Sequence, residues 1–132
     1  MPPMFLNGGG MRGGPVHQHI EGVPLLGELR TAPKYRFYSV RDEFPALVPA
    51  AGGGAAIIGE LYDVPIEMLH HSLLPAEPPE LELGTIEHED GSVSFAVLLR
   101  REVLERAEGL TEITKYGGWR AYRDEGTAER ST

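Results

Sequence analysis

Residues 81–99 read LELGTIEHEDGSVSFAVLL, two runs of alternating apolar and polar side chains on either side of the dipeptide Asp90-Gly91. Alternation with a period of two is typical of a strand with one buried face. The Asp-Gly dipeptide suits the positive φ angles of a tight turn between antiparallel strands. This stretch predicts a β-hairpin and indicates that antiparallel pairing is the framework of the fold.

Further strands are predicted on the amino-terminal side of the hairpin. Residues 35–40 (YRFYSV) combine aromatic and β-branched side chains, and residues 55–64 (AAIIGELYDV) form a mostly apolar run. Residues 44–49 (FPALVP) are held extended by their prolines. The whole chain gives five or six strands and too few helices to act as crossovers between parallel strands. We therefore predict an α+β fold, a small mixed and mostly antiparallel β-barrel with one or two short helices.

The helices are predicted from proline placement and apolar spacing. Residues 63–73 carry Pro65 in the first turn and leucines at helical spacing, which indicates a brief helix. We expect residues 74–79 to end it, because the prolines at positions 75, 78 and 79 lack the N–H that continues the hydrogen-bond ladder. Residues 103–107 predict a second short helix, and residues 116–122 (YGGWRAY) predict a compact corner of aromatic residues and glycines.

Composition limits the class of protein. The chain has 132 residues, no cysteine and a formal net charge of −8, which fits one domain over residues 1–123 followed by a polar tail over residues 124–132. The lack of cysteine excludes disulfides and thiolate metal sites, and the negative charge disfavours nucleic acids and anionic membranes as partners. Without a signal peptide or a long apolar run, we expect a cytoplasmic protein.

The amino terminus contains the most distinctive candidate site. Residues 4–15 (MFLNGGGMRGGP) take a short apolar strand directly into consecutive glycines and one arginine. Glycines without a Cβ let several backbone N–H groups point at one ligand, so this loop predicts a cradle for a small carboxylate or phosphate. The alternative is a glycine-rich turn with no ligand.

Several motifs in the same order resemble the γ-glutamylcyclotransferase-like superfamily, which includes stand-alone members and the C-terminal domain of allophanate hydrolases. The resemblance covers most of the chain, and its motifs are residues 7–14, Gly27-Glu28, residues 35–40, residues 44–49 and residues 58–62. The corner at residues 116–122 is similar to the end of the allophanate hydrolase domain in particular.

The resemblance implies an enzyme with one acid/base glutamate just after the helix that follows the Gly-Glu-Leu-Tyr strand. By position this residue is Glu77, with Glu80 and Glu82 as fallbacks if the prolines shift the register. Prolines and leucines around Glu77 favour a raised carboxyl pKa, which suits a general base near neutral pH. The substrate, a carboxylate-bearing amide or amine, is expected to contact Asn7, Gly8, Gly9, Gly10, Met11, Arg12, His17, Arg36 and Tyr38.

The glycine loop departs from the family pattern. Asn7 stands where the family has tyrosine, Gly9 where it has serine or threonine, and Gly10 where the allophanate hydrolase domain carries histidine. These departures support an alternative, a non-catalytic module that binds a small carboxylate or associates with an amidase. The expected protein partner is a second copy of the chain or an amidase.

The histidines do not indicate a metal site. His70 and His71 are adjacent, and neighbouring helical residues point about 100° apart, so the two rings cannot share one ion as an i, i+4 pair would. We predict neither a metal nor a cofactor.

Overall fold

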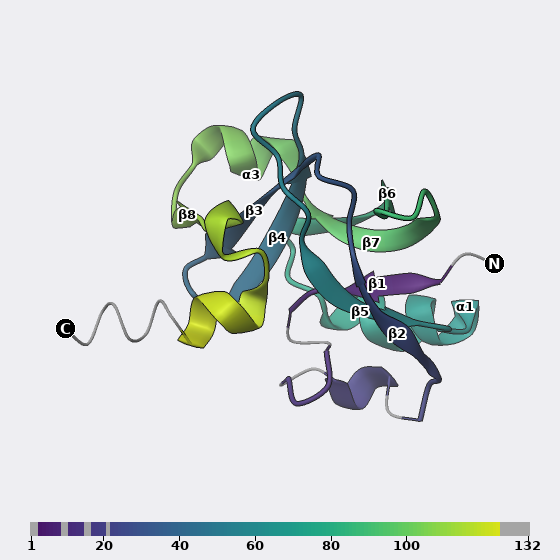
Figure 1. The fold of residues 1–132 in the computed structure, drawn as a ribbon. Helices are drawn as coiled ribbons and strands as arrows, with labels where there is room; N and C mark the ends of the chain where they lie inside the picture. Colours follow the sequence, from purple (N-terminus) through teal and green to yellow (C-terminus); the bar gives the residue numbers. More distant parts are fainter. Residues whose placement is uncertain (1–2, 9–10, 15–16, 21, 125–132) are drawn as a thin grey trace.

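The computed structural model describes residues 3–8, 11–14, 17–20 and 22–124, which form one curled sheet with short helices around it (Figure 1). The strands are β1 (Met4–Leu6), β2 (Leu25–Arg30), β3 (Tyr35–Val40), β4 (Phe44–Pro49), β5 (Ile58–Tyr62), β6 (Leu81–Glu87), β7 (Val93–Leu99) and β8 (Leu110–Glu112). The helical segments are η1 (His17–Ile20), α1 (Ile66–Met68), η2 (Leu69–Leu73), α2 (Leu74–Ala76), α3 (Arg101–Arg106), η3 (Thr114–Tyr116) and residues 119–124. The predicted fold class is confirmed.

The predicted hairpin is formed by β6 and β7. Its register runs from Leu81 opposite Leu99 to Glu87 opposite Val93. At the turn, Gly91 adopts a φ of 85°, a conformation that glycine takes without strain. The Asp90 carboxylate accepts a hydrogen bond from the backbone N–H of Ser92 and stabilises the turn.

Strand β7 is the point where the sheet divides into two wings. On one edge it pairs with β6, while on the other edge Phe95 pairs in parallel with Met4 of β1 and Leu98 pairs in parallel with Leu47 of β4. The strand order is therefore β2-β5-β1-β7-β4-β3-β8, with the remaining neighbouring pairs antiparallel. The β1-β5-β2 wing and the β4-β3-β8 wing separate beyond β7.

The glycine-rich loop leaves β1 at this division. A Cβ placed on Gly8 would lie 2.6 Å from Cδ of Pro45, at the start of β4. Glycine at this position thus allows the loop to pass closely against the other wing. Gly9 and Gly10 lie outside the described residues.

The strand count differs from the prediction, and one helix contains a turn that was not predicted. The described residues form eight strands rather than five or six, because β2 and the short β8 are stabilised by pairing with β5 and β3 more than by their own sequence pattern. The helix includes Pro75 and ends at Ala76, inside the segment 74–79 that was predicted to end it. In the π-helical turn η2, Leu74 N–H bonds to Leu69 O, and this wider turn accommodates a proline ring that would clash in a regular α-helix.

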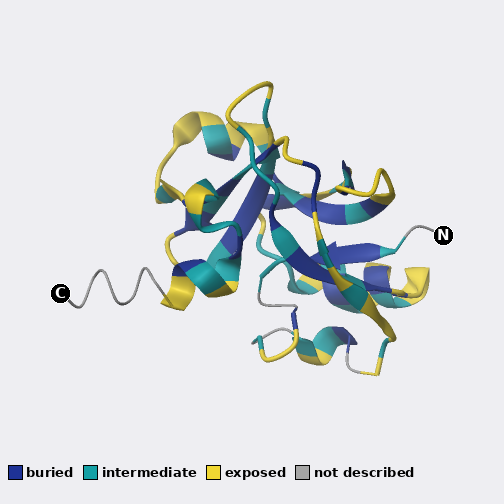
Figure 2. Cartoon of the chain, in the orientation of Figure 1, coloured by how far each residue is buried: buried dark blue, intermediate teal, exposed yellow. Residues whose placement is uncertain are grey.

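The core has two hydrophobic clusters, and Figure 2 shows buried residues along the strands with exposed residues on the outer loops. Trp119 contacts both clusters, so the helical segment at residues 119–124 closes the gap between them. Its ring lies 5.7 Å from that of Tyr122, which confirms the predicted aromatic corner. Of the predicted tail, Asp124 is helical, and residues 125–132 lie outside the described residues. Among the described helices, none has the length and apolar character needed to cross a membrane.

Candidate functional site

A buried carboxylate on β5 forms the centre of the candidate site. Because β5 lies between β1 and β2, Glu60 is opposite Leu6 on one side and Glu28 on the other, and its side chain is fully buried. Tyr62 lies on the same face two residues later, and its hydroxyl donates a hydrogen bond of 2.8 Å to Glu60 Oε1. Strand alternation therefore places an acid and a phenol together inside the sheet.

Two arginines from distant segments complete the surroundings of Glu60. The backbone N–H and the Nε–H of Arg12 donate to the two carboxylate oxygens at 2.7 and 2.8 Å. Nη2 of Arg120 lies 3.4 Å from Oε2. Glu60 therefore links the glycine loop and the helical segment at residues 119–124 to the interior of β5.

These contacts determine the ionisation of the pair on β5. Burial by itself disfavours the charged form of Glu60, but the hydrogen bonds from Arg12 and Tyr62 and the charge of Arg120 lower its pKa to about 2. Burial and the neighbouring carboxylate raise the pKa of Tyr62 to about 12. At neutral pH, Glu60 is ionised and Tyr62 keeps its proton.

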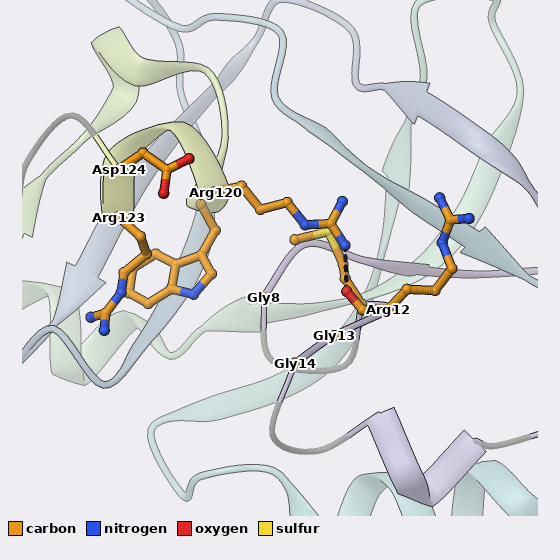
Figure 3. Close-up of a pocket in the computed structure, with 9 residues that line it drawn as sticks. Gly8, Arg12, Gly13, Gly14, Arg120, Arg123 and Asp124 are labelled. Atoms are coloured by element: carbon orange, nitrogen blue, oxygen red, sulfur yellow. Dashed lines mark hydrogen bonds between the residues drawn. The ribbon is translucent and has the colours of Figure 1, made fainter.

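A cavity of about 360 Å³ lies between the glycine loop and the C-terminal helical segment. In Figure 3, Arg120 reaches from the helix toward the loop and donates to the backbone oxygen of Arg12 at 2.7 Å, while the Arg12 guanidinium extends away from it. Glycines, arginines and two apolar side chains line the cavity, and these residues are Gly8, Met11, Arg12, Gly13, Gly14, Trp119, Arg120, Arg123 and Asp124.

The structure brings some of the predicted substrate-binding residues to this cavity and places others elsewhere. Gly8, Met11 and Arg12 line it, whereas the described residue Asn7 is not among the lining residues. His17, in η1, packs its ring 5.9 Å from the ring of Tyr62.

The two predicted residues on β3 lie in the other wing. Arg36 donates to Gly52 O and lies 4.0 Å from a carboxylate oxygen of Glu112, and Tyr38 is opposite Ala46 in the sheet. Neither is among the described residues that line the cavity.

Glu77 caps the end of the helix that includes Pro75. Its backbone N–H bonds to Leu74 O at 3.1 Å, and its own conformation is extended. Among the described residues, no donor or cation pairs with its carboxylate. Burial raises the pKa of Glu77 to about 7.

The chain after Glu77 is fixed by arginines. Arg100 Nε donates to Pro79 O at 2.8 Å, and Arg41 Nη1 lies 2.8 Å from Glu80 Oε2. The hydrogen bond from Arg41 lowers the pKa of Glu80, and exposed Glu82 pairs with Arg100 at 3.3 Å. The two fallback carboxylates thus have cationic partners, unlike Glu77.

One hydrophobic cluster connects the end of the helix with the cavity. Leu73 and Leu74, directly before Glu77, pack in the cluster that contains Met11 and Trp119. Both of these residues line the cavity. Glu77 itself is not among the described residues that line the cavity, so the shared hydrophobic cluster is what links the two.

Sequence reasoning missed the central residue of this site. Glu60 is the one acid within the apolar run at residues 55–61. It lies two residues before Tyr62, so in a strand the two side chains face the same side. A carboxylate whose side chain faces the buried side of a central strand requires hydrogen-bond donors or cations around it. This feature of the sequence could have indicated Glu60. Its partners Arg12 and Arg120 lie 48 and 60 residues away in the chain.

The histidines lie apart from the cavity. His88 is buried in the core, where its Nε2 is 2.7 Å from Ser94 Oγ, and the rings of His70 and His71 contact each other on the surface. Within the described part of the chain, no three histidine or carboxylate side chains gather in a way that would hold a metal ion.

Comparisons with known proteins match nearly the whole chain. The family model of the allophanate hydrolase C-terminal domain matches residues 2–124. The urea amidolyase of Saccharomyces cerevisiae is 31% identical over 122 residues, which are 87% of this chain and 6% of that protein. The chain therefore spans a small fraction of the curated relatives it matches.

Solved structures agree with this match. A uropathogenic E. coli-specific protein has a TM-score of 0.85 and 31% identity, covering 93% of this chain and 95% of that one. The Kluyveromyces lactis urea amidolyase has a TM-score of 0.84 and 23% identity over 94% of this chain and 8% of that one, and it shows the fold alone. The resemblance indicated by the sequence motifs is confirmed.

Proposed function

The chain belongs to the allophanate hydrolase C-terminal domain family, and on this basis we propose that it is a small-molecule enzyme acting on a carboxylate-bearing amide or amine. In this proposal, Glu77 is the acid/base. The glycine loop around Gly8 holds the substrate carboxylate through backbone N–H groups. The substrate class includes γ-glutamyl amines and urea-derived carboxylates, which share one carboxylate and one amide-like nitrogen.

The state of the Glu77 carboxyl carries this proposal. A carboxyl group that is partly removed from water without a donor or cation destabilises the fold, so its presence calls for a reason other than stability. Burial raises its pKa to about 7, and a group with that pKa gives and takes a proton equally well near neutral pH. Glu80 and Glu82 lie in ion pairs with Arg41 and Arg100, and these cationic partners make them poorer candidates.

The proposed chemistry needs a proton to move twice. When the substrate is a γ-glutamyl amine, its own amino group attacks the amide carbonyl, and ionised Glu77 takes the proton from the attacking nitrogen. The protonated Glu77 then gives that proton to the departing amine as the amide C–N bond breaks. Glu60 supports this step at a distance, because it holds Arg12 and with it the glycine loop.

The test is a turnover screen followed by one substitution. Purified protein is incubated with pools of γ-glutamyl amines and urea-derived carboxylates, and products are detected by mass spectrometry. For the substrate found, Glu77→Gln should reduce turnover by about 10²–10⁴-fold while binding persists. Glu67→Gln changes an exposed glutamate at the start of the same helix and should retain turnover.

Other outcomes identify which part of the proposal fails. Full turnover in Glu77→Gln, with loss in Glu80→Gln or Glu82→Gln, would move the acid/base to the other side of Pro78-Pro79. Full turnover in all three variants would exclude the glutamate mechanism.

A second candidate function is a carboxylate-binding or amidase-associated module without catalysis. It is favoured by the arginine-lined cavity, whose described lining residues do not include Glu77. The match to urea amidolyase also favours it, because the similar region is only 6% of that protein and is therefore one small part of a much longer chain. Carboxylate binding without turnover of any pooled compound would support this candidate over the enzyme.

A further inference from the structure

The turn that follows Glu77 has few hydrogen-bond donors of its own. Pro78 and Pro79 have no N–H, and the turn closes through the bond from Leu81 N–H to Pro78 O at 3.1 Å. Glu77 lies directly before the turn in an extended conformation, with φ −77° and ψ 146°. A residue that precedes proline is restricted to this region, so the Glu77 backbone does not rearrange independently of the turn. The direction of the Glu77 side chain therefore depends on how the turn is held.

One residue from another part of the sheet holds this turn. Arg100 lies between β7 and α3, its backbone N–H donates to Glu80 O at 2.9 Å, and its Nε–H donates to Pro79 O at 2.8 Å. Among the described residues, these are the hydrogen bonds that connect the carbonyl groups of Pro79 and Glu80 to a different element. Arg41 also contacts Glu80, but at the carboxylate end of the side chain, which restrains the backbone less.

Arg100 is itself fixed in place. Its N–H continues the pairing of β6 with β7, and its C=O accepts hydrogen bonds of 3.1 Å from Val103 N–H and Leu104 N–H at the start of α3. Its guanidinium, 41% exposed, also has Nη1 3.3 Å from the Glu82 carboxylate. A planar guanidinium held at two points presents its Nε–H in one direction. The side chain of Arg100 is therefore a defined support for the turn.

We propose that Arg100 is a positioning residue for Glu77: its Nε–H bond to Pro79 O holds the turn, and the held turn keeps the Glu77 carboxyl away from water. The catalytic consequence of this contact rests on the proposed function, in which Glu77 is the acid/base. The contact itself belongs to the free protein and can be tested without a substrate.

The Glu77 pKa reports how far the carboxyl is removed from water. The neighbouring carboxylates of Glu80 and Glu82 are paired with Arg41 and Arg100. Among the described residues, no charged group contributes to the ionisation of Glu77, and its pKa of about 7 results from burial.

Loss of the contact and loss of the charge change this pKa in opposite directions. Removing the Arg100 cation would by itself raise the Glu77 pKa, because a nearby cation favours the carboxylate form. Releasing the turn admits water to the carboxyl and lowers its pKa from about 7 toward the ordinary 4.5. The sign of the change therefore separates a positioning role from a purely electrostatic one.

The experiment is a carbon NMR titration of the Glu77 carboxyl in the full chain. Arg100→Gln should lower the Glu77 pKa from about 7 to about 6 or below. Arg100→Lys keeps one charged donor for Pro79 O and should recover part of the change. The matched control is Arg101→Gln, which removes the adjacent, exposed arginine and should leave the pKa at about 7.

A measurement on the unmodified chain covers the case in which Arg100→Gln does not fold, which circular dichroism would detect. The Arg100 Nε–H is directed at a backbone oxygen, whereas the Arg101 side chain is 90% exposed. The Nε–H of Arg100 should therefore exchange with water at least about tenfold more slowly than that of Arg101. Equal exchange rates would overturn the proposal.

The activity of the same variants separates this inference from the proposed function. For the substrate found in the turnover screen, the acid limb of kcat/KM against pH should move to lower pH in Arg100→Gln together with the Glu77 pKa, because ionised Glu77 is the base. A lowered Glu77 pKa without movement of the limb would support the role of Arg100 and reject Glu77 as the acid/base. An unchanged or raised Glu77 pKa in folded Arg100→Gln would overturn the inference and leave the proposed function standing.

Discussion

Glu60 on β5 and Glu77 at the end of α2 are both withdrawn from water, yet their ionisation is opposite. Glu60 is fully buried, receives hydrogen bonds from Arg12 and Tyr62, and has a pKa lowered to about 2. Glu77 is less buried, has no donor among the described residues, and has a pKa raised to about 7. The deeper group is the stronger acid, so here the partners outweigh the burial.

This contrast separates a group that stabilises the fold from one available for chemistry. The paired carboxylate at Glu60 is committed to holding the glycine loop and the C-terminal helical segment, and changing its charge would disturb both. The unpaired carboxyl at Glu77 weakens the fold at neutral pH and can change charge without breaking a contact. The comparison can be tested by removing the charge of each group and by removing one hydrogen-bond partner of Glu60.

The largest effect is expected from Glu60→Gln. It should lower the free energy of unfolding by about 3 kcal/mol at pH 7, because hydrogen bonds to a charged group contribute about 1.5–3 kcal/mol each. Urea denaturation measures this value. Glu28→Gln, at an exposed residue opposite Glu60 on β2, is the control and should change stability by less than about 0.5 kcal/mol.

The pH dependence of this loss follows from the lowered pKa. The Glu60 pKa is about 2 in the folded protein against an ordinary value of 4.5. Its ionised form therefore stabilises the fold fully above pH 4.5, and this stabilisation disappears as the pH falls toward 2. The difference between wild type and Glu60→Gln should shrink over that range, and a constant difference would show that charge is not the cause.

An intermediate effect with the opposite sign is expected from Glu77→Gln. The Glu77 pKa is about 7 in the folded protein against 4.5, so between these values the unfolded chain loses a proton that the folded protein keeps. Stability therefore falls as the pH rises from 4.5 to 7 and stays low above that range. The difference between 4.5 and about 7 corresponds to about 3.5 kcal/mol at about 1.4 kcal/mol for each pKa unit, and the remaining exposure of Glu77 to water reduces this effect. Glutamine does not ionise, so the variant should be more stable than wild type by about 2 kcal/mol at pH 8.

Thermal and urea unfolding at pH 4 and pH 8 would measure this change. The two proteins should have similar stability at pH 4, where wild-type Glu77 is protonated. Glu67→Gln should show no comparable pH dependence. A Glu77→Gln variant that is less stable than wild type at pH 8 would mean that the carboxylate has a stabilising partner, and the contrast with Glu60 would be lost.

The smallest effect is expected from Tyr62→Phe, which removes one donor to Glu60 and leaves the ring in place. The free energy of unfolding should fall by about 1 kcal/mol, the usual contribution of one hydrogen bond. The Glu60 pKa, followed by NMR of its carboxyl carbon, should rise because one of its donors is gone. If the pKa does not move, the arginines alone determine the ionisation of Glu60.

Much of the fold follows from local pattern. The hairpin, strand β3 and the aromatic corner were predicted within a residue or two, because alternation, turn dipeptides and glycine placement act between near neighbours. The helix ends within the predicted segment 74–79, but its π-helical turn was not predicted, since such a turn has no simple sequence signature.

The sequence by itself determined the framework, the family resemblance and the setting of Glu77, whose prolines and leucines are its neighbours along the chain and favour the raised pKa that the structure shows. Only the tertiary structure decided the surroundings of Glu60 and the cavity beside Arg120. Arg12 and Arg120 are 108 residues apart, and they meet only because β5 lies between β1 and β2 and the chain returns after β8. Pairing across such distances depends on sheet order and burial, which no local spacing of residues encodes.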